Sequence, residues 1–444
     1  MMEKNQELEV EIVSYGSEGQ GVARIDNFVV FVPMTIVGEV VKIHIIKVAK
    51  NYAIGKVVEI IKPSKFRCDK KCSVYGKCGG CSLQHIDYKK TLDIKKQIVE
   101  DAMSKIANLT NFNVKNVVAS ENSYNYRNKS AFPLFVNEGK LEVCMYRNLS
   151  HDHIFVENCP ISNKYINKVA EIFKSFANES FREKELYSLK YLVVRVVDNK
   201  ILVTIVSDIP IKNVNALYYD IKTNLNLEDD GLGLFWCKKS QDNNVILEGT
   251  LKHLLGIKNI TTNILGVNVE ISPLSFFQVN FDIMTKIYSK VQNYISDTDV
   301  VVDAYSGAGL MSALIAQKAK VVYGIEIVPE ATKNADWLKH KNKINNLENI
   351  NGDMTIELPK LVGKLNNNID VMVVDPPRKG MEINVVNTII NVCPEKIIYI
   401  SCNPATLARD VKLLSDKYNV VEIEPYDMFP QTSHIETFAV LRKK

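Results

Sequence analysis

Cys402 lies where a nucleophile would be expected. It follows the apolar run Lys396 to Ile400, which predicts a buried strand, and Asn403-Pro404 turns the chain sharply after it. A thiolate at the carboxyl end of such a strand could add to a ring, and a base is needed if a proton must later leave. His434 and Glu436, just before the last predicted strand, could supply that base. Spacing alone gives equal weight to a small core cysteine.

Two glycines follow another predicted strand, Val300 to Ala304. Gly307 and Gly309 would let the backbone approach a nucleoside closely at the turn into the next helix. Glu326 closes the following predicted strand nineteen residues after Gly307, where a carboxylate can hydrogen-bond ribose hydroxyls. Because a third glycine is missing, an adenosine without phosphates is favoured over a pyrophosphate, which indicates S-adenosylmethionine. An ordinary turn between strand and helix is the alternative.

An acid and two prolines end a third apolar strand, Val371 to Val374. The prolines stiffen the loop, so that Asp375 is presented beyond the carboxyl edge of the sheet. A carboxylate there can accept a hydrogen bond from the imide or amine of a nucleobase. A plain strand exit is the alternative reading of this segment, and these residues would be an unusual choice for it.

A cluster of cysteines precedes all of these segments in the chain. Its members are Cys68, Cys72, Cys78 and Cys81. The last two enclose a pair of glycines, which predicts a hairpin whose amides point at sulfur. Such a cluster binds zinc or an iron–sulfur cluster, and spacing alone does not separate the two. The cluster lacks the C-x3-C-x2-C arrangement of radical enzymes that cleave S-adenosylmethionine.

These residues require a scaffold that brings the carboxyl ends of several strands to one edge. From about Ser272 onward, short apolar runs alternate with helical stretches, which predicts an α/β unit with a parallel sheet wound by helices. The segment from Val420 onward adds two more strand candidates, and seven strands with an antiparallel edge would suit a Rossmann-like methyltransferase. Residues 7–62 predict five short strands of an OB-like barrel, and residues 120–265 an α+β region. Asp87 to Leu109 has helical periodicity.

Composition narrows the class of protein. The 444 residues predict two to four domains, and 46% hydrophobic with 24% charged residues is typical of an ordinary globular protein. No apolar run reaches the roughly 18 residues of a membrane span, and no apolar core follows the first residues, so neither a membrane span nor a secretory signal is expected. Nine cysteines without an export signal indicate a reducing compartment, and we expect the cytoplasm.

Positive charge is unevenly distributed. The net charge is only +4, but Lys42 to Lys90 contains twelve lysines and arginines against three acidic residues. A basic segment on a neutral body is typical of a protein that binds a phosphate backbone. A solvated lysine-rich surface is the alternative.

Together these segments resemble the RNA uracil-5-methyltransferase family, in particular its iron–sulfur members that act on 23S ribosomal RNA. The resemblance covers essentially the whole chain, and the N-terminal part resembles the TRAM module, an RNA-binding OB-like domain. It rests on four strings in the family's order: Cys72 to Cys81, Ser275 to Asn280, Asp375 to Arg378, and Ser401 to Thr406. Four parts are therefore expected: a TRAM-like barrel (1–62), a central domain with the cluster (63–82 and 120–265), a helix packed on the methyltransferase domain (83–119), and that domain itself (266–444).

The resemblance also implies site residues. Cys72, Cys78 and Cys81, with the distant Cys159, would hold a [4Fe-4S] cluster, which leaves Cys68 as a spare thiol or fallback ligand. The residues expected to contact S-adenosylmethionine are Gln278, Tyr305, Gly307, Gly309, Glu326, Asp353 and Asp375. Those expected to bind the RNA base or the strand around it are Phe277, Gln278, Asp375 and Arg127.

The implied reaction is methylation of uracil C5 in RNA. Cys402 would add to C6 as the nucleophile, the resulting enolate would take the methyl group, and Glu436 would remove the C5 proton as the general base. The expected partner is 23S ribosomal RNA, with a monomeric enzyme, no obligate protein partner and no membrane.

Three alternatives remain open from the sequence. The same chemistry could act on tRNA. A base- or protein-amine methyltransferase could use Asp375-Pro376-Pro377, but it would need neither Cys402 nor Glu436. A non-catalytic, metal-stabilised RNA-binding protein would explain the barrel and the cysteines, but it leaves Cys402 and the glycine turn without a use.

Overall fold

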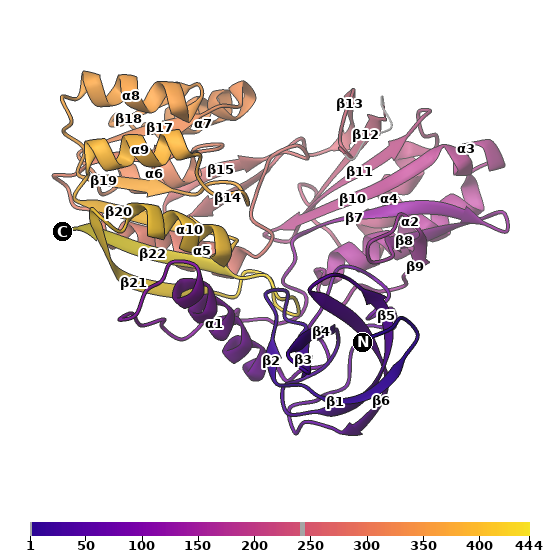
Figure 1. Cartoon of the computed structure of the whole chain (residues 1–444). Coiled ribbons are helices and arrows are strands. Elements are labelled where there is room, and N and C mark those ends of the chain that lie inside the picture. The colour runs from indigo at the N-terminus through magenta and orange to yellow at the C-terminus, as the bar shows by residue number, and fades with distance from the viewer. Residues whose placement is uncertain (1, 240–244) are drawn as a thin grey trace.

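The computed structural model describes residues 2–239 and 245–444. Residue 1 and residues 240–244, which the expected ranges 1–62 and 120–265 include, lie outside the described residues. Three large sheets organise the chain, one each in its N-terminal, central and C-terminal parts (Figure 1). No helix of the described ranges is long and apolar enough to cross a membrane.

The N-terminal sheet has six strands in the order β1-β5-β6-β4-β3-β2. Their bounds are β1 Glu7–Glu11, β2 Ser14–Tyr15, β3 Gly21–Ile25, β4 Phe28–Val32, β5 Val40–Val48 and β6 Tyr52–Lys62. The sheet has one strand more than the five expected, and β2, with two residues, is too short to show any alternation. The Val13 amide donates to the carbonyl of Val22 at 2.9 Å, so the end of β1 meets β3 and the sheet curls toward closure.

The cysteine segment links β6 to helix α1 (Tyr88–Lys105). Asp87 caps this helix, because its side chain accepts hydrogen bonds from the amides of Lys89 and Lys90. The buried stripe of α1, which includes Val99 and Met103, joins the hydrophobic core of the C-terminal sheet. In Figure 1 α1 accordingly lies beside β21.

The central sheet has seven strands in the order β13-β12-β11-β10-β7-β8-β9. Its strands are β7 Lys129–Asn137, β8 Lys140–Tyr146, β9 His153–Phe155, β10 Leu189–Val197, β11 Lys200–Ser207, β12 Leu232–Lys238 and β13 Leu251–Gly256. Helices α2 (Lys164–Ser180) and α4 (Val214–Asn224) cover one face and share its core, and the short α3 spans Glu183–Ser188. The hairpin of β14 (Ile260–Ile264) and β15 (Val267–Ile271) leads to the C-terminal part.

The expected boundary between residues 265 and 266 falls in the turn of that hairpin. Both of its strands bury side chains in the same core as α5 and α6, which belong to the C-terminal part. The four expected domain ranges stay a prediction.

The C-terminal sheet has seven strands in the order β18-β17-β16-β19-β20-β22-β21. Its strands are β16 Val300–Ala304, β17 Val321–Glu326, β18 Leu347–Asn351, β19 Val371–Val374, β20 Lys396–Ser401, β21 Tyr418–Tyr426 and β22 Glu436–Lys443. Every pair up to β20 is parallel, and β22 runs antiparallel to both of its neighbours. The predicted α/β fold with an antiparallel edge is therefore confirmed. Strand order reverses at β16 and β19, which is where open α/β sheets bind ligands.

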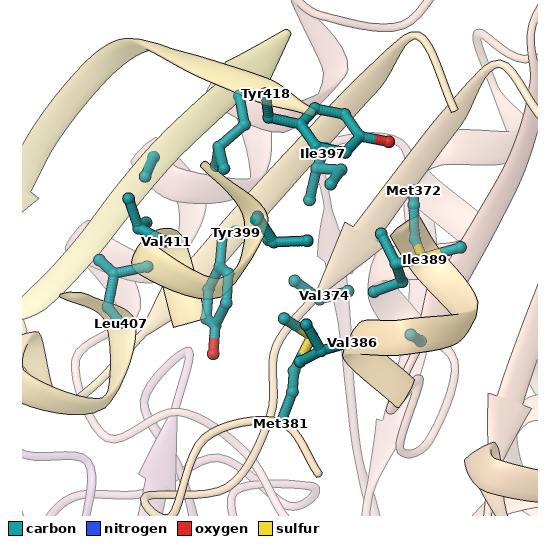
Figure 2. Close-up of a cluster of buried hydrophobic side chains, with 14 of the residues drawn as sticks. Met372, Val374, Met381, Val386, Ile389, Ile397, Tyr399, Leu407, Val411 and Tyr418 are labelled. Atoms are coloured by element: carbon teal, nitrogen blue, oxygen red, sulfur yellow. The ribbon is translucent and has the colours of Figure 1, made fainter. Parts of the chain in front are cut away.

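Helices cover both faces of this sheet, so its inner strands are largely apolar. The helices are α5 Phe281–Gln292, α6 Leu310–Ala316, α7 Pro329–Lys341, α8 Met354–Lys364, α9 Ile383–Val392 and α10 Pro404–Leu414. One face packs against α1, α8, α9 and α10, and the other against α5, α6 and α7. Figure 2 shows the first core, where Val374 of β19 and Tyr399 of β20 meet Ile389 and Leu407. Each such side chain contributes roughly 1.5–3 kcal/mol by burial, which fixes the strand ends that carry the site.

Candidate active site

The turn after β16 has the backbone that its two glycines allow. Gly307 and Gly309 have φ angles of 56° and 81°, in the left-handed region. A Cβ on Gly309 would lie 2.6 Å from the Cβ of Ala335 in α7, so no larger residue fits there. Tyr305 also has a positive φ, 66°, although it is not a glycine. Strain of this kind is stored where surrounding structure enforces it, and it is typical of functional turns.

Glu326, at the end of β17, ties this turn to the next one. Its carboxylate accepts hydrogen bonds from the amide of Gly307 at 2.9 Å and from the amide of Val328 at 2.8 Å. Asp353 caps α8, because its Oδ1 accepts from the amide and the hydroxyl of Thr355. Both carboxylates line one cavity of about 650 Å³. Three consecutive strand ends therefore present backbone and carboxylate groups to one crevice, as a nucleoside requires.

Cys402 and Glu436 lie at the ends of two adjacent strands. β20 ends at Ser401 and β22 begins at Glu436, and Ser401 pairs with Thr437 in the antiparallel register. The next residues along each strand, Cys402 and Glu436, therefore come together, and both line the 650 Å³ cavity. The predicted nucleophile and base, 34 positions apart in the chain, are thus brought to one place by sheet register.

Asp375 follows β19 and faces the same cavity. Desolvation by the surrounding protein raises the pKa of its carboxyl to about 7. At neutral pH the group can therefore be a hydrogen-bond donor as well as an acceptor, which suits the imide edge of a pyrimidine.

Glu436 is only 5% exposed. Burial raises its pKa well above the usual range, the nearby Asp375 carboxyl raises it further, and the Arg378 guanidinium opposes both effects. A carboxylate with a raised pKa is a stronger base than a free one, so the site makes Glu436 suited to remove a proton.

The Cys402 thiol is not activated in the free protein. Burial raises its pKa, the neighbouring Glu436 and Asp375 carboxyls raise it further, and Arg378 lowers it. The resting group is therefore the thiol, and Arg378 is the cation that favours its thiolate. The sequence predicted no role for Arg378, although it belongs to the string Asp375 to Arg378. Its guanidinium lowers the pKa of both Cys402 and Glu436, which indicates that it is part of the site.

His434 lines the cavity as well and lies on the loop before Glu436. Burial lowers its pKa, and Arg378 and Lys95 lower it further. Its ring is therefore mostly neutral at pH 7, so it remains an alternative base to Glu436.

A second cavity of about 360 Å³ adjoins the first. The two cavities share Gln278, Tyr305, Gly307 and Asp375, all of them predicted cofactor residues. Phe277, predicted to bind the base, lines only the smaller cavity. Gly309 lines neither, because it forms the N-cap of α6 against α7.

The predicted cluster ligands surround a third cavity, of about 170 Å³. Cys72, Cys78, Cys81 and Cys159 line it, together with Arg127, whereas Cys68 does not. Arg127 therefore lies at the cysteines, away from the cavity of Cys402. Among the described residues no group of three or more histidine, cysteine or acidic side chains is arranged to hold a metal ion. The four thiols line a single cavity, and four cysteine thiolates are a donor set that both a zinc ion and an iron–sulfur cluster use.

Comparison with known proteins places these features in a family. Residues 87–444 match the family model described as tRNA (uracil-5-)-methyltransferase, and residues 2–58 match the TRAM domain. A protein of Clostridium tetani, called an uncharacterized RNA methyltransferase, is 37% identical over 99% of this chain and 97% of its own length. A protein with the same description from Bacillus cereus is 35% identical over 99% of this chain and 98% of its own length.

Solved structures give the same fold. The Pyrococcus abyssi tRNA (uracil-54, C5)-methyltransferase, solved with S-adenosyl-L-homocysteine, superposes with a TM-score of 0.76 over 98% of this chain and 100% of that one, at 23% identity. At this identity the likeness shows that the two chains share a fold from end to end.

Proposed function

Since this chain belongs to the tRNA (uracil-5-)-methyltransferase family and carries a TRAM domain, it is an S-adenosylmethionine-dependent RNA uracil-C5 methyltransferase, and we propose that it methylates a uridine of 23S ribosomal RNA through a covalent adduct of Cys402. The observation that carries this proposal is the 650 Å³ cavity, in which Cys402 and Glu436 lie together with Glu326 and Asp353 of the cofactor crevice. An amine methyltransferase has no need of that thiol and that base beside its crevice.

Four groups of this chain divide the chemistry. Cys402 adds to C6 of the uracil as a thiolate, which makes C5 an enolate carbon able to take the methyl group. Glu436 then removes the C5 proton, and the C6–S bond breaks with return of the electron pair to Cys402. Asp375 holds the imide edge of the base, and Arg378 stabilises the thiolate. The target nucleotide must first leave its stack, which costs about a few kcal/mol.

The cofactor site is proposed from the same cavities. S-adenosylmethionine, when bound, supplies an electrophilic methyl group. Glu326 is placed for the ribose hydroxyls, Asp353 for the adenine, and the Tyr305–Gly309 turn for close backbone contact. Gln278 and Asp375 border both cavities, so they would orient the base and the cofactor toward each other.

Cys72, Cys78, Cys81 and Cys159 are proposed to hold a [4Fe-4S] cluster. The four-thiol lining of one cavity supports this assignment. Methyl transfer to an enolate carbon needs no electron, so the cluster would be structural and would join the 72–81 segment to the central sheet.

The choice of ribosomal RNA over tRNA is supported by the cysteine string, which resembles that of the family's iron–sulfur members. A ribosomal RNA substrate implies the cytoplasm as the compartment. Mass mapping of 5-methyluridine in 23S ribosomal RNA and in tRNA, with and without this protein, tests the choice directly. Loss of the modification from tRNA alone would make tRNA the substrate.

The covalent step is tested with RNA that contains 5-fluorouracil. Fluorine at C5 cannot leave as a proton, so the methylated adduct should persist as a cross-linked band on denaturing gels and should require S-adenosylmethionine. Cys402→Ala should abolish the band, whereas Cys68→Ala, at an exposed thiol, should keep it. A band that survives in Cys402→Ala would contradict the assignment of the nucleophile.

A further inference from the structure

The loop between β21 and β22, residues 427–435, ends at Glu436, and its backbone is held from four separate parts of the chain. Four consecutive carbonyls each accept a hydrogen bond from a different segment. Asn280 donates to Met428 at 3.3 Å, Lys95 to Phe429 at 3.0 Å, Tyr126 to Pro430 at 3.0 Å, and the amides of Ser82 and Leu83 to Gln431 at 3.0 Å. Buried carbonyl groups need hydrogen-bond donors, and here all four carbonyls take donors from outside the loop. We call residues 427–435 the base loop.

Lys95 of α1 secures the start of the base loop. Its ammonium donates to Asp427 at 2.5 Å as well as to the Phe429 carbonyl, and the side chains of Lys95 and Asp427 are both fully buried. Tyr88 donates to the other oxygen of Asp427 at 2.9 Å. A buried ion pair with its remaining lone pairs satisfied fixes geometry strongly, because removal of one partner leaves a buried charge.

The end of the base loop is secured from the cysteine segment. Ser82, next to Cys81, accepts a hydrogen bond on its Oγ from the amide of Ser433 at 3.0 Å. Gln431 between these contacts has a φ of 68°, a left-handed conformation that costs energy and is kept by the bonds on either side. Tyr126, which holds the Pro430 carbonyl, is the neighbour of Arg127 at the cysteine cavity.

We propose that Ser82, Lys95 and Tyr126 are positioning residues that hold Glu436 through the base loop, so that the cysteine segment supports proton abstraction and release of the RNA rather than formation of the adduct. This inference rests on the proposed role of Glu436. None of the three touches the 650 Å³ cavity, whereas Phe429, His434 and Glu436 of the loop region line it. Cys402 is held separately, by β20 and by the N-terminus of α10.

The experiment separates adduct formation from release. RNA transcripts of large-subunit ribosomal RNA and tRNA are made with 5-fluorouridine, whose adduct reports addition and methyl transfer, or with uridine tritiated at C5, whose loss of tritium reports proton abstraction. Tyr126→Phe and Ser82→Ala should each slow tritium release about fivefold, the effect of one lost hydrogen bond. The same variants should form the 5-fluorouridine adduct at the normal rate and should accumulate adduct on ordinary uridine.

Controls make the outcome decisive. Tyr418→Phe is the matched control, because its buried hydroxyl also donates to a proline carbonyl, that of Pro394 at 2.9 Å, remote from the loop. It should lower the melting temperature as Tyr126→Phe does and leave tritium release unchanged. Ser82→Thr keeps the hydroxyl and should restore release.

Three results would overturn the inference. Equal slowing of adduct formation and tritium release in Tyr126→Phe and Ser82→Ala would show a general defect instead of a positioning role. Normal release in both variants, with Glu436→Gln trapping the adduct, would show that Tyr126 and Ser82 are not positioning residues, which ends the proposal and leaves Glu436 as the base. If Glu436→Gln itself traps no adduct, the proposed base fails and the inference fails with it.

Discussion

At the scale of single residues, the surroundings of the reactive groups favour their protonated forms. The Glu436 and Asp375 carboxyls raise the pKa of Cys402, Asp375 also raises the pKa of Glu436, and burial raises the pKa of all three. Arg378 is the cation that lowers the pKa of both the thiol and the Glu436 carboxyl. The pKa-lowering effect of Arg378, set against burial and the neighbouring carboxyls, should therefore determine the pH range in which the enzyme is active.

Arg378→Gln should move the rising limb of the pH–rate profile to higher pH. Without the guanidinium, the pKa values of Cys402 and Glu436 both rise, so a smaller fraction of each is deprotonated at neutral pH and the rate there falls. The rate should recover in more alkaline buffer, and single-turnover methyl transfer across pH measures this. Lys379→Gln removes a neighbouring charge whose Nζ donates to Glu382 at 2.7 Å, and should leave the profile in place.

Glu436→Gln should trap the methylated adduct on ordinary uridine. Addition and methyl transfer need no base at this position, but elimination does, and loss of a general base costs about 10²–10⁴-fold in rate. A stable cross-linked band on denaturing gels, with a full complement of transferred methyl, is the measurement. If Glu436→Gln turns over normally while His434→Ala stalls, the two residues must exchange roles.

Residue types and spacing predicted much of the cavity but not what supports it. Cys402, Asp375 and Glu326 each stand at the carboxyl end of a predicted strand, so the topology rule for parallel sheets brings them together. Glu436 joins them because it begins the antiparallel strand β22 beside the end of β20. The Lys95–Asp427 pair joins positions 332 residues apart. Nothing local marks either residue, because a lysine on an amphipathic helix normally faces solvent.

At the scale of elements, the glycine turn depends on how closely α7 approaches it. Gly309→Ala should destabilise the protein by about 3 kcal/mol, from the left-handed φ and the contact with Ala335. Gly139→Ala is the matched control, with a φ of 78° and no atom near the added Cβ, and should cost only about 1 kcal/mol. Urea unfolding of both variants checks the difference, and equal losses would show that φ alone matters.

Elements buried on both sides were the most predictable. β16 and β19 begin and end at the residues that the apolar runs indicated, because strands covered by helices on both faces are mostly apolar. The two-residue β2 is too short to show any alternation. β13, whose residues are half-exposed or exposed, and the parallel pairing of β11 with β12 depend on contacts between distant segments, which local patterns do not contain.

At the scale of the whole molecule, the four-cysteine cavity joins the segment after the N-terminal sheet to the central sheet. Protein purified without oxygen should be brown, with about four iron and four sulfide per chain. Cys159→Ser should lower the iron content and loosen the 72–81 segment, measured as faster proteolysis there, whereas Cys68→Ser should change neither. Colourless protein with stoichiometric zinc from an anaerobic preparation would contradict the iron assignment.

The way the base loop is anchored ties catalysis to the completion of folding. Its donors come from α1, the cysteine segment, the loop before β7, and the N-cap of α5, so they converge only when each of those parts has assembled. Contacts of such long sequence separation form late in folding, after local structure. A chain whose C-terminal sheet has folded, but whose base loop is not yet anchored, would have Cys402 in place without a positioned Glu436. On the proposed mechanism such a chain would bind RNA covalently and not release it. Only the fully folded chain would then release its product and turn over.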